Sequence, residues 1–230
     1  MTKVFSALAV SIDGYITGPH PSPEQPLGIG GARLFDWYTE GDTPSRIFEG
    51  FQLWPASAAV FDAAAERVGA VISGRKTYDD SRGWDGGGPH PTAPLFVLSH
   101  RPPPGPPVSS DEQVFITTGI ADAVSVARQA AAAAGRDVGL MGSGVVAAGL
   151  LDEEILHQVP VLLGGGTPYF HDLASSVPLT PLEVVDAPGV THLRFACSPG
   201  NWRRPNIAWR AKRPWSAAPP PASARLPCSA

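Results

Sequence analysis

The chain lacks the features that mark several common classes of protein. It has two cysteines, Cys197 and Cys228, so it holds no disulfide framework and no cysteine-based metal site. Its six histidines show no metal-ligand spacing, and no His-Glu-x-x-His sequence occurs. No apolar run approaches the ~20 residues that a membrane-spanning helix needs. These absences argue against a metal site and a membrane protein, and the low cysteine content favours a reducing compartment.

The absence of other motifs excludes further classes of protein. Met1-Thr2-Lys3 leads directly into Val4-Phe5, without the longer apolar region and the small-residue cleavage site of a signal peptide. We therefore expect a cytoplasmic protein. The sequence has no G-x-S-x-G elbow and no G-x-x-x-x-G-K-[ST] loop, so hydrolase and nucleotide-triphosphatase functions lack their residues.

Acidic residues are absent from the last part of the chain. The formal net charge is −4, but residues 1–196 hold all 21 acidic residues, and residues 197–230 hold six basic ones. An acidic body argues against nucleic-acid binding by the core. Residues 197–230 also contain seven prolines and three of the six tryptophans. Such a segment buries too little apolar area to offset its ordering entropy, so we expect a domain at 1–196 and a poorly ordered tail.

Residues 1–196 alternate between strand and helix patterns, which predicts an α/β fold with a mainly parallel central sheet flanked by helices. A final antiparallel hairpin is expected from Leu182–Val185 and Val190–Ala196, around Pro188-Gly189. The other expected strands are Lys3–Val10, Ala70–Ser73, Leu95–Leu98, Gln113–Thr117, Val138–Met141 and Ile155–Leu163. The expected helices are Ala32–Tyr38, Ser57–Val68, Ile120–Ala134 and Val145–Leu150.

Three of these strands end in small or basic residues. The stretches are Ser73-Gly74-Arg75-Lys76-Thr77, Ser99-His100-Arg101 and Gly142-Ser143-Gly144. A strand that feeds a helix N-terminus presents free backbone N–H groups and a positive dipole end, which together bind anions. Three such stretches, two of them with cations, predict a ligand with several phosphates, and a dinucleotide fits best. The alternative is a set of tight turns whose cations are merely solvated.

Several further motifs occur along residues 1–196. They are Ser11-Ile12-Asp13-Gly14-Tyr15-Ile16-Thr17-Gly18, Gly74-Arg75-Lys76-Thr77-Tyr78, Val97-Leu98-Ser99-His100-Arg101-Pro102, Met141-Gly142-Ser143-Gly144, Gly149-Leu150-Leu151-Asp152-Glu153, Pro160-Val161-Leu162-Leu163-Gly164-Gly165-Gly166-Thr167-Pro168 and Thr191-His192-Leu193-Arg194-Phe195. In their order and spacing these motifs resemble the dihydrofolate-reductase-like family, in the branch of the C-terminal reductase domain of the bifunctional riboflavin-biosynthesis deaminase-reductase. The likeness covers about residues 1–196.

The resemblance implies a dihydrofolate-reductase-like fold and NADPH as hydride donor, with the three stretches around its phosphates. The 2′-phosphate of NADPH needs cations, and Arg75, Lys76, His100 and Arg101 follow two neighbouring strands. The cofactor-binding residues predicted in this way are Gly74, Arg75, Lys76, Thr77, Ser99, His100, Arg101, Gly142, Ser143, Gly144, Val145 and Gly165.

The residues from Gly142 to Ala147 also match G-x-G-x-x-A, the Rossmann fingerprint. The next acids, Asp152 to Glu154, come about ten residues later, whereas the ribose-binding acid of that fold lies at ~20. The following helix is also too short for that unit. A Rossmann domain is therefore not favoured.

The resemblance places the substrate beside the first strand, the loop after it and the next helix, where Asp13 and Asp36 are the candidate catalytic acids. Asp-Gly is also a turn dipeptide, so Asp13 has bracing of the loop as its alternative role. Asp36 lies between Phe35 and Trp37, where partial burial suits a general acid, and a solvated helix face is its alternative.

The function expected from the resemblance is NADPH-dependent reduction of a small pterin- or aminopyrimidine-like heterocycle. A non-catalytic NADPH-binding sensor or assembly protein is the alternative. Related reductase domains usually pair, so we expect a homodimer, with residues 155–163 in a core strand or near a shared sheet edge. Asp152-Glu153 lies where an expected helix gives way to a strand, so we expect it to be structural, capping or bracing these elements.

Overall fold

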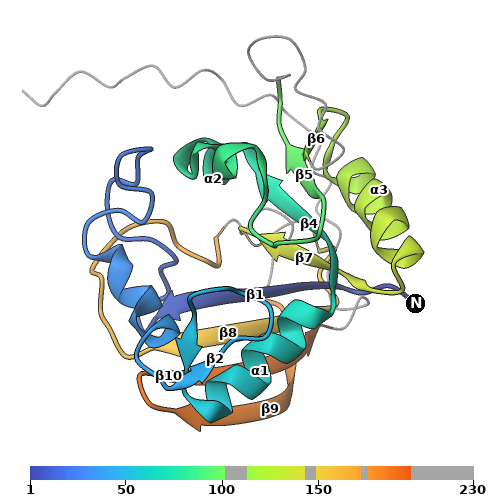
Figure 1. The fold of residues 1–230 in the computed structure, drawn as a ribbon. Helices are drawn as coiled ribbons and strands as arrows, with labels where there is room; N and C mark the ends of the chain where they lie inside the picture. Colours follow the sequence, from blue (N-terminus) through green and yellow to red (C-terminus); the bar gives the residue numbers. More distant parts are fainter. Residues whose placement is uncertain (102–112, 143–148, 172, 174–175, 198–230) are drawn as a thin grey trace, which may run out of the picture.

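An eight-stranded sheet forms the centre of the structure (Figure 1). The structure is a computed structural model and describes residues 1–101, 113–142, 149–171, 173 and 176–197. The strand order is β6-β5-β4-β7-β1-β8-β10-β9. These strands are β1 (Val4–Ser11), β4 (Val68–Gly74), β5 (Leu95–Leu98), β6 (Gln113–Ile116), β7 (Asp137–Met141), β8 (Glu153–Val159), β9 (Leu179–Ala187) and β10 (Val190–Cys197).

The sheet is parallel from β6 through β8, and β10 is antiparallel to both of its neighbours, β8 and β9. Strand β4 shows why, because its first six residues are all buried. A strand that is covered on both faces requires helices on both sides of the sheet, as parallel sheets have. The α/β fold class with a C-terminal hairpin, predicted from the sequence, is confirmed.

Helices cover both faces of this sheet (Figure 1). On one face, α3 (Ile120–Ala133) buries Ala123, Ala127 and Ala131 at intervals of one helical turn, against β4 and β7. On the other face lies α1 (Pro55–Glu66), which begins with a proline at its first position, where a missing N–H costs nothing. The shorter elements are η1 (Gly31–Tyr38), β2 (Thr43–Pro44), β3 (Gln52–Leu53), α2 (Arg75–Asp80) and η2 (Arg82–Gly86).

The structure corrects several expected boundaries. Strand β8 ends at Val159 rather than Leu163, because Pro160 has no N–H for the ladder. It begins at Glu153, two residues before the expected start, since two buried carboxyl groups replace the apolar pattern there. Its position between β1 and β10 makes it an interior strand.

Other expectations differ in smaller ways. Residues 31–38 form a 3₁₀ helix rather than α-helical turns, and β10 ends at the buried Cys197, one residue beyond the expected end of this strand. The expected helix at 145–150 falls mostly on residues outside those described, and so do residues 198–230 of the tail. None of the helices in the described parts of the chain is both long and apolar enough to cross a membrane.

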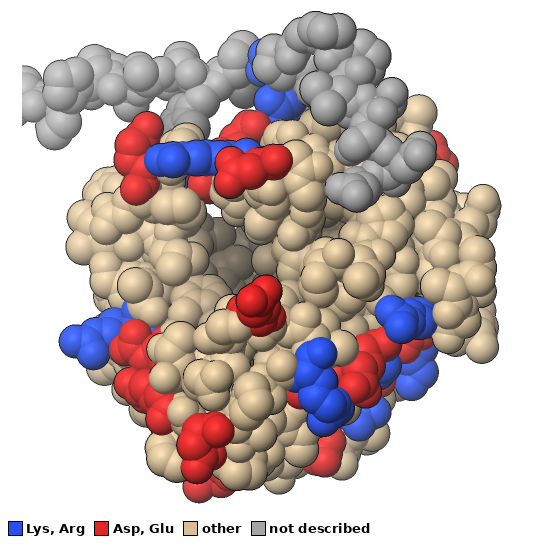
Figure 2. Space-filling view, viewed as in Figure 1, with Lys and Arg blue, Asp and Glu red and all other residues tan. Residues whose placement is uncertain are grey.

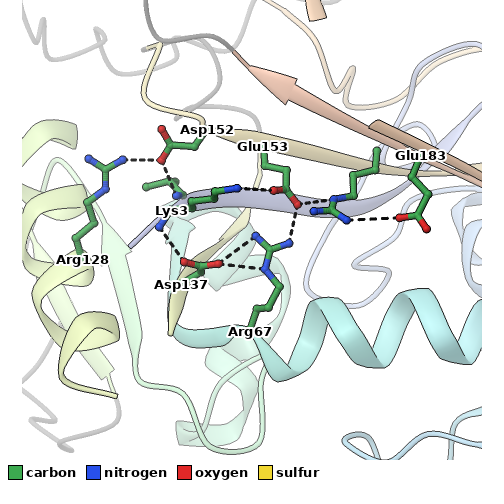
Figure 3. Close-up of polar contacts among 9 residues, drawn as sticks. Lys3, Arg67, Arg128, Asp137, Asp152, Glu153 and Glu183 are labelled. Atoms are coloured by element: carbon green, nitrogen blue, oxygen red, sulfur yellow. Dashed lines mark hydrogen bonds and ion pairs between the residues drawn. The ribbon is translucent and has the colours of Figure 1, made fainter. Parts of the chain in front are cut away.

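An ion-pair network joins the amino ends of the central strands (Figure 3). At its centre is Glu153, whose side chain is 1% exposed. Its Oε1 accepts hydrogen bonds from Arg67 Nη1 at 2.6 Å and Arg194 Nε at 2.9 Å, and Lys3 Nζ lies 3.3 Å from Oε2. Burial alone would raise the pKa of Glu153, but the two arginines hold it below its ordinary value. The network lies at the end of the sheet opposite the strands' carboxyl ends.

A second buried carboxyl group, Glu154, points to the other face of the sheet, because successive side chains of a strand alternate. The hydroxyl of Tyr169 lies 2.6 Å from Glu154 Oε2 and 2.7 Å from Ser6 Oγ. Among the described residues, Glu154 Oε1 has no hydrogen-bond partner. Burial therefore raises the pKa of Glu154 well above its ordinary value, although the hydrogen bond from Tyr169 acts in the opposite direction.

Candidate functional site

A cavity of about 530 Å³ opens at the carboxyl ends of β1, β4, β5 and β7, and we name it the strand-end cavity. Open parallel sheets bind ligands at this end. Figure 2 shows that the face in view is hollowed near its centre, with charged side chains in a row where Figure 1 places α2. The described lining residues are Leu8, Ala9, Ile16, Thr17, Pro26, Leu27, Phe35, Ile72, Gly74, Lys76, Thr77, Asp80, Ser81, Leu98, Leu140, Met141, Gly142, Thr167 and His171.

The first predicted phosphate-binding stretch contributes to this cavity. Gly74, Lys76 and Thr77 line it. Lys76 Nζ pairs with Asp80 at 2.5 Å, and Arg75 Nε pairs with Asp79 at 2.8 Å, each across one turn of α2. Exposed pairs of this kind contribute little to stability, so both cations can exchange their partner for a bound anion.

The other two stretches are placed less completely. Ser99 Oγ donates to the carbonyl of Arg101 at 2.7 Å, which shapes a turn at the end of β5 that carries His100. These three residues follow a strand adjacent to β4 but do not line the strand-end cavity. Gly142 does line it, with a positive φ of 117°. Ser143, Gly144 and Val145 lie outside the described residues.

Asp13 braces two loops. Its carboxylate accepts hydrogen bonds from Ser11 Oγ at 2.6 Å, from the N–H of Gly164 at 2.7 Å and from the N–H of Leu163 at 3.2 Å. The hydrogen bond from Ser11, joined by those of the two amides, lowers the pKa of Asp13. A carboxyl group with a lowered pKa is an acceptor at neutral pH and a poor proton donor.

Asp36, the other predicted catalytic acid, lies on η1 with its side chain 42% exposed. Arg33 Nη1 lies 3.4 Å from its Oδ2. Asp36 is not among the residues that line the strand-end cavity, whereas its neighbour Phe35 is. Of the described lining residues, the one acidic side chain is that of Asp80.

Sequence reasoning did not identify Thr17 and Thr167 as residues of the strand-end cavity, which they both line. Thr17 Oγ1 lies 2.9 Å from Thr167 Oγ1 and accepts the N–H of Thr167 at 3.1 Å. The contact depends on Gly166, where a Cβ would lie 1.9 Å from the carbonyl oxygen of Thr17 and φ is +129°. Gly165, a predicted cofactor residue, belongs to the same loop but does not line the cavity.

A second cavity, of about 490 Å³, lies on the α1 face of the sheet, and we name it the aromatic cavity. Five residues line both cavities, so the two spaces adjoin: Leu8, Ala9, Phe35, Leu140 and Met141. Its lining includes the aromatic side chains of Phe5, Phe35, Tyr38, Phe48, Phe51, Phe61 and Trp84.

The structure thus defines an α/β domain with a cavity at the carboxyl ends of its parallel strands. The chain belongs to the family described as the RibD C-terminal domain, whose model matches residues 2–193. It is thus a reductase-type domain, and the dihydrofolate-reductase-like fold class predicted from the sequence agrees with this family.

Solved structures show the same fold. A protein of Shewanella sp. PV-4 assigned to riboflavin biosynthesis has 23% identity and a TM-score of 0.61, over 86% of this chain and 99% of that one. Acinetobacter baumannii RibD has 17% identity and a TM-score of 0.50. The Thermotoga maritima diaminohydroxyphosphoribosylaminopyrimidine deaminase/5-amino-6-(5-phosphoribosylamino)uracil reductase has 13% and 0.51. The chain covers 58% and 57% of these two proteins, which each cover 86% of it. None of the curated proteins compared with the chain matches it.

Proposed function

We propose that the protein is an NADPH-dependent reductase that transfers a hydride to a small, flat heterocycle of the pterin or aminopyrimidine type. The observation that carries the proposal is the strand-end cavity in a chain of the RibD C-terminal domain family. The Thermotoga relative is named as a reductase of an aminouracil, which supports a heterocyclic acceptor.

The lining of the strand-end cavity suits a nicotinamide dinucleotide. Its walls combine apolar strand residues such as Ile72 and Leu140 with the hydroxyls of Thr17, Thr77 and Thr167. Glycines at the strand ends and the cations of α2 are suited to the phosphates. When bound, NADPH supplies the hydride, and the residues of this chain bind the cofactor and exclude water from it.

The test is a titration with NADPH, followed by measurement of the loss of nicotinamide absorbance with a panel of pteridines and aminopyrimidines. Tight NADPH binding with turnover of at least one acceptor is expected. Binding without turnover of any acceptor would instead identify a non-catalytic sensor or assembly protein.

NADPH is expected to bind more tightly than NADH by about 1–3 kcal/mol, which is the range for charge-assisted contacts to the 2′-phosphate. Arg101→Ala is expected to erode this preference more than it weakens NADH binding, because we propose that its guanidinium faces the 2′-phosphate, which NADH lacks. Calorimetry at low salt with both cofactors provides the measurement. Equal dissociation constants in the wild-type protein would refute the assignment of the cations.

Asp13→Asn is expected to keep most of the turnover, because the amide oxygen still accepts an N–H and no proton is taken from this residue. Asp13→Ala is expected to weaken NADPH binding about fivefold, since losing a backbone brace costs about 1 kcal/mol. Dissociation constants and kcat of both variants, measured over a pH series, separate the two roles. Loss of turnover in Asp13→Asn with unchanged NADPH affinity would make Asp13 a proton donor after all.

We also propose that the protein is a homodimer. Strand β8 is interior, so an additional chain would have to pair elsewhere. Edge strand β9 supports the proposal, because it exposes two apolar side chains, Leu182 at 49% and Val184 at 65%. Light scattering at micromolar concentration is expected to give twice the chain mass of 24.0 kDa. A value of one chain mass would rule the dimer out.

A further inference from the structure

The described lining of the aromatic cavity is uncharged. None of its described lining residues is Asp, Glu, Lys or Arg. Its polar side chains are limited to Tyr38, Trp84 and His90. Burial raises the pKa of Tyr38, so its phenol stays neutral.

His90 is neutral as well. Its Nδ1 accepts the N–H of Thr92 at 3.3 Å, so the ring proton is on Nε2, which lies 3.2 Å from the carbonyl oxygen of Ala65. Both ring nitrogens are therefore engaged with the protein. Burial is the main cause that lowers the pKa of His90, which keeps the ring uncharged at neutral pH.

One side of the cavity is a group of stacked rings. The rings of Tyr38 and Phe51 are stacked with centroids 4.7 Å apart, and Phe48 stacks on Phe51 at 5.3 Å. Phe61 of α1 lies 5.2 Å from Tyr38 and 5.4 Å from Phe48. An aromatic ligand can make offset-stacked and edge-to-face contacts with such a group. These contacts add to the binding free energy beyond the contribution of the buried area.

The sheet side of the cavity carries small residues, which leave the space open. Ala7 and Ala9 of β1 and Gly139 of β7 line it. A side chain at position 139 would be tight, since its Cβ would lie 3.3 Å from Val68 Cγ2. The cavity thus combines an aromatic group with a small-residue sheet surface, and a planar ligand matches both.

We infer that the aromatic cavity binds a flat, uncharged aromatic compound that carries neither phosphate nor carboxylate. A buried anion needs a cation or several donors, whereas the described lining has no cation and its side-chain donors with a free N–H or O–H to offer are the neutral Tyr38 and Trp84. Since the cavity adjoins the strand-end cavity, a ligand in it lies against the cofactor proposed there.

The role of this ligand as the reduced substrate rests on the proposed function. In that role one double bond of the ligand accepts a hydride from NADPH and a proton from water, and NADPH becomes NADP⁺. The substrate of this reductase would then differ from an acceptor that carries a phosphoribosyl group. The phosphate of such an acceptor would have to stay outside the aromatic cavity.

The test compares 2-naphthol with 2-naphthyl phosphate, which share one ring system and differ by a phosphate. Calorimetry without cofactor is expected to show binding of 2-naphthol and at least tenfold weaker binding of the phosphate ester. Equal or tighter binding of the ester, or no binding of 2-naphthol, would overturn the inference. Because no cofactor is present, this outcome is independent of a separate NADPH titration, and failure of that titration alone would remove only the proposed function.

A matched pair of variants locates the binding. Ala7 is partly buried and lines only the aromatic cavity, so Ala7→Phe fills it and is expected to weaken 2-naphthol binding at least tenfold. Ala59→Phe makes the same change on the exposed side of α1 and is expected to leave binding unchanged. Unchanged binding in a folded Ala7→Phe would overturn the assignment. If Ala7→Phe does not fold and so shows no thermal unfolding transition, the comparison of 2-naphthol with 2-naphthyl phosphate on the wild-type protein still tests the inference.

Discussion

Glu153→Gln is expected to lower the free energy of unfolding by about 3 kcal/mol at pH 7, the lower end of the range for breaking a buried ion pair. The variant removes the charge that faces Arg67 and Arg194. The lower end applies because both arginines are partly exposed and Arg67 keeps its pair with Asp137.

The effect of Glu153 has a definite dependence on pH. Its pKa in the folded protein lies below the ordinary value of 4.5, so its contribution is present above pH 4.5 and is lost as pH falls through the folded value. Denaturant unfolding at a series of pH values is expected to show wild type and variant converging in acid. Glu183→Gln is the control, because this exposed carboxylate lies 3.5 Å from Arg194 and should contribute less than about 0.5 kcal/mol. A Glu153→Gln variant as stable as this control would contradict the role of the network.

Glu154→Gln is expected to have the opposite effect and to stabilise the protein at pH 8, because the folded wild-type protein resists the ionisation that the unfolded chain undergoes. Among the described residues, the carboxyl group of Glu154 has no cation beside it, and its Oε1 has no hydrogen-bond partner. Glutamine keeps an acceptor for the Tyr169 hydroxyl but never ionises.

The sign follows from the raised pKa of Glu154. In the unfolded chain this group ionises above pH 4.5, whereas in the folded protein it stays protonated to a higher pH. Wild-type stability is therefore lost as pH rises above 4.5, by about 1.4 kcal/mol for each unit until the folded pKa is reached. The free energies of unfolding of wild type and variant should be equal near pH 4 and differ increasingly as the pH rises. A difference that is independent of pH, or a less stable variant at pH 8, would show that Glu154 is ionised in the fold.

The elements that could be predicted from the sequence are those whose local pattern agrees with their environment. The apolar run of β4 and the alanine face of α3 needed no tertiary information. The start of β8 could not be predicted, because Glu153 and Glu154 are polar in sequence and become compatible with burial only through partners distant along the chain. Arg67 and Tyr169 are such partners, and no local signal connects them.

The site could be predicted where a motif follows a strand. Gly74, Lys76, Thr77 and Gly142 line the strand-end cavity at the predicted ends of β4 and β7. The aromatic cavity could not be predicted, because its rings come from β1, η1, the segment between β2 and β3, α1 and η2, without a common motif. Asp36 shows the limit of local reasoning, since its neighbour Trp37 is buried and Phe35 packs against the same cluster, while its own carboxylate pairs with Arg33.

The position of β1 has a consequence for how the chain acquires this structure. Its two neighbours, β7 and β8, follow it by more than 120 residues, so the first strand to be synthesised stays without either partner until residues 137–159 have emerged. Pairings of such long sequence separation fold slowly, because loop closure precedes the contacts that compensate for it. Until then both edges of an apolar strand are open to pairing with another chain. The sheet that positions the cavities is thus completed late, and its central strand is the segment most in need of protection during synthesis.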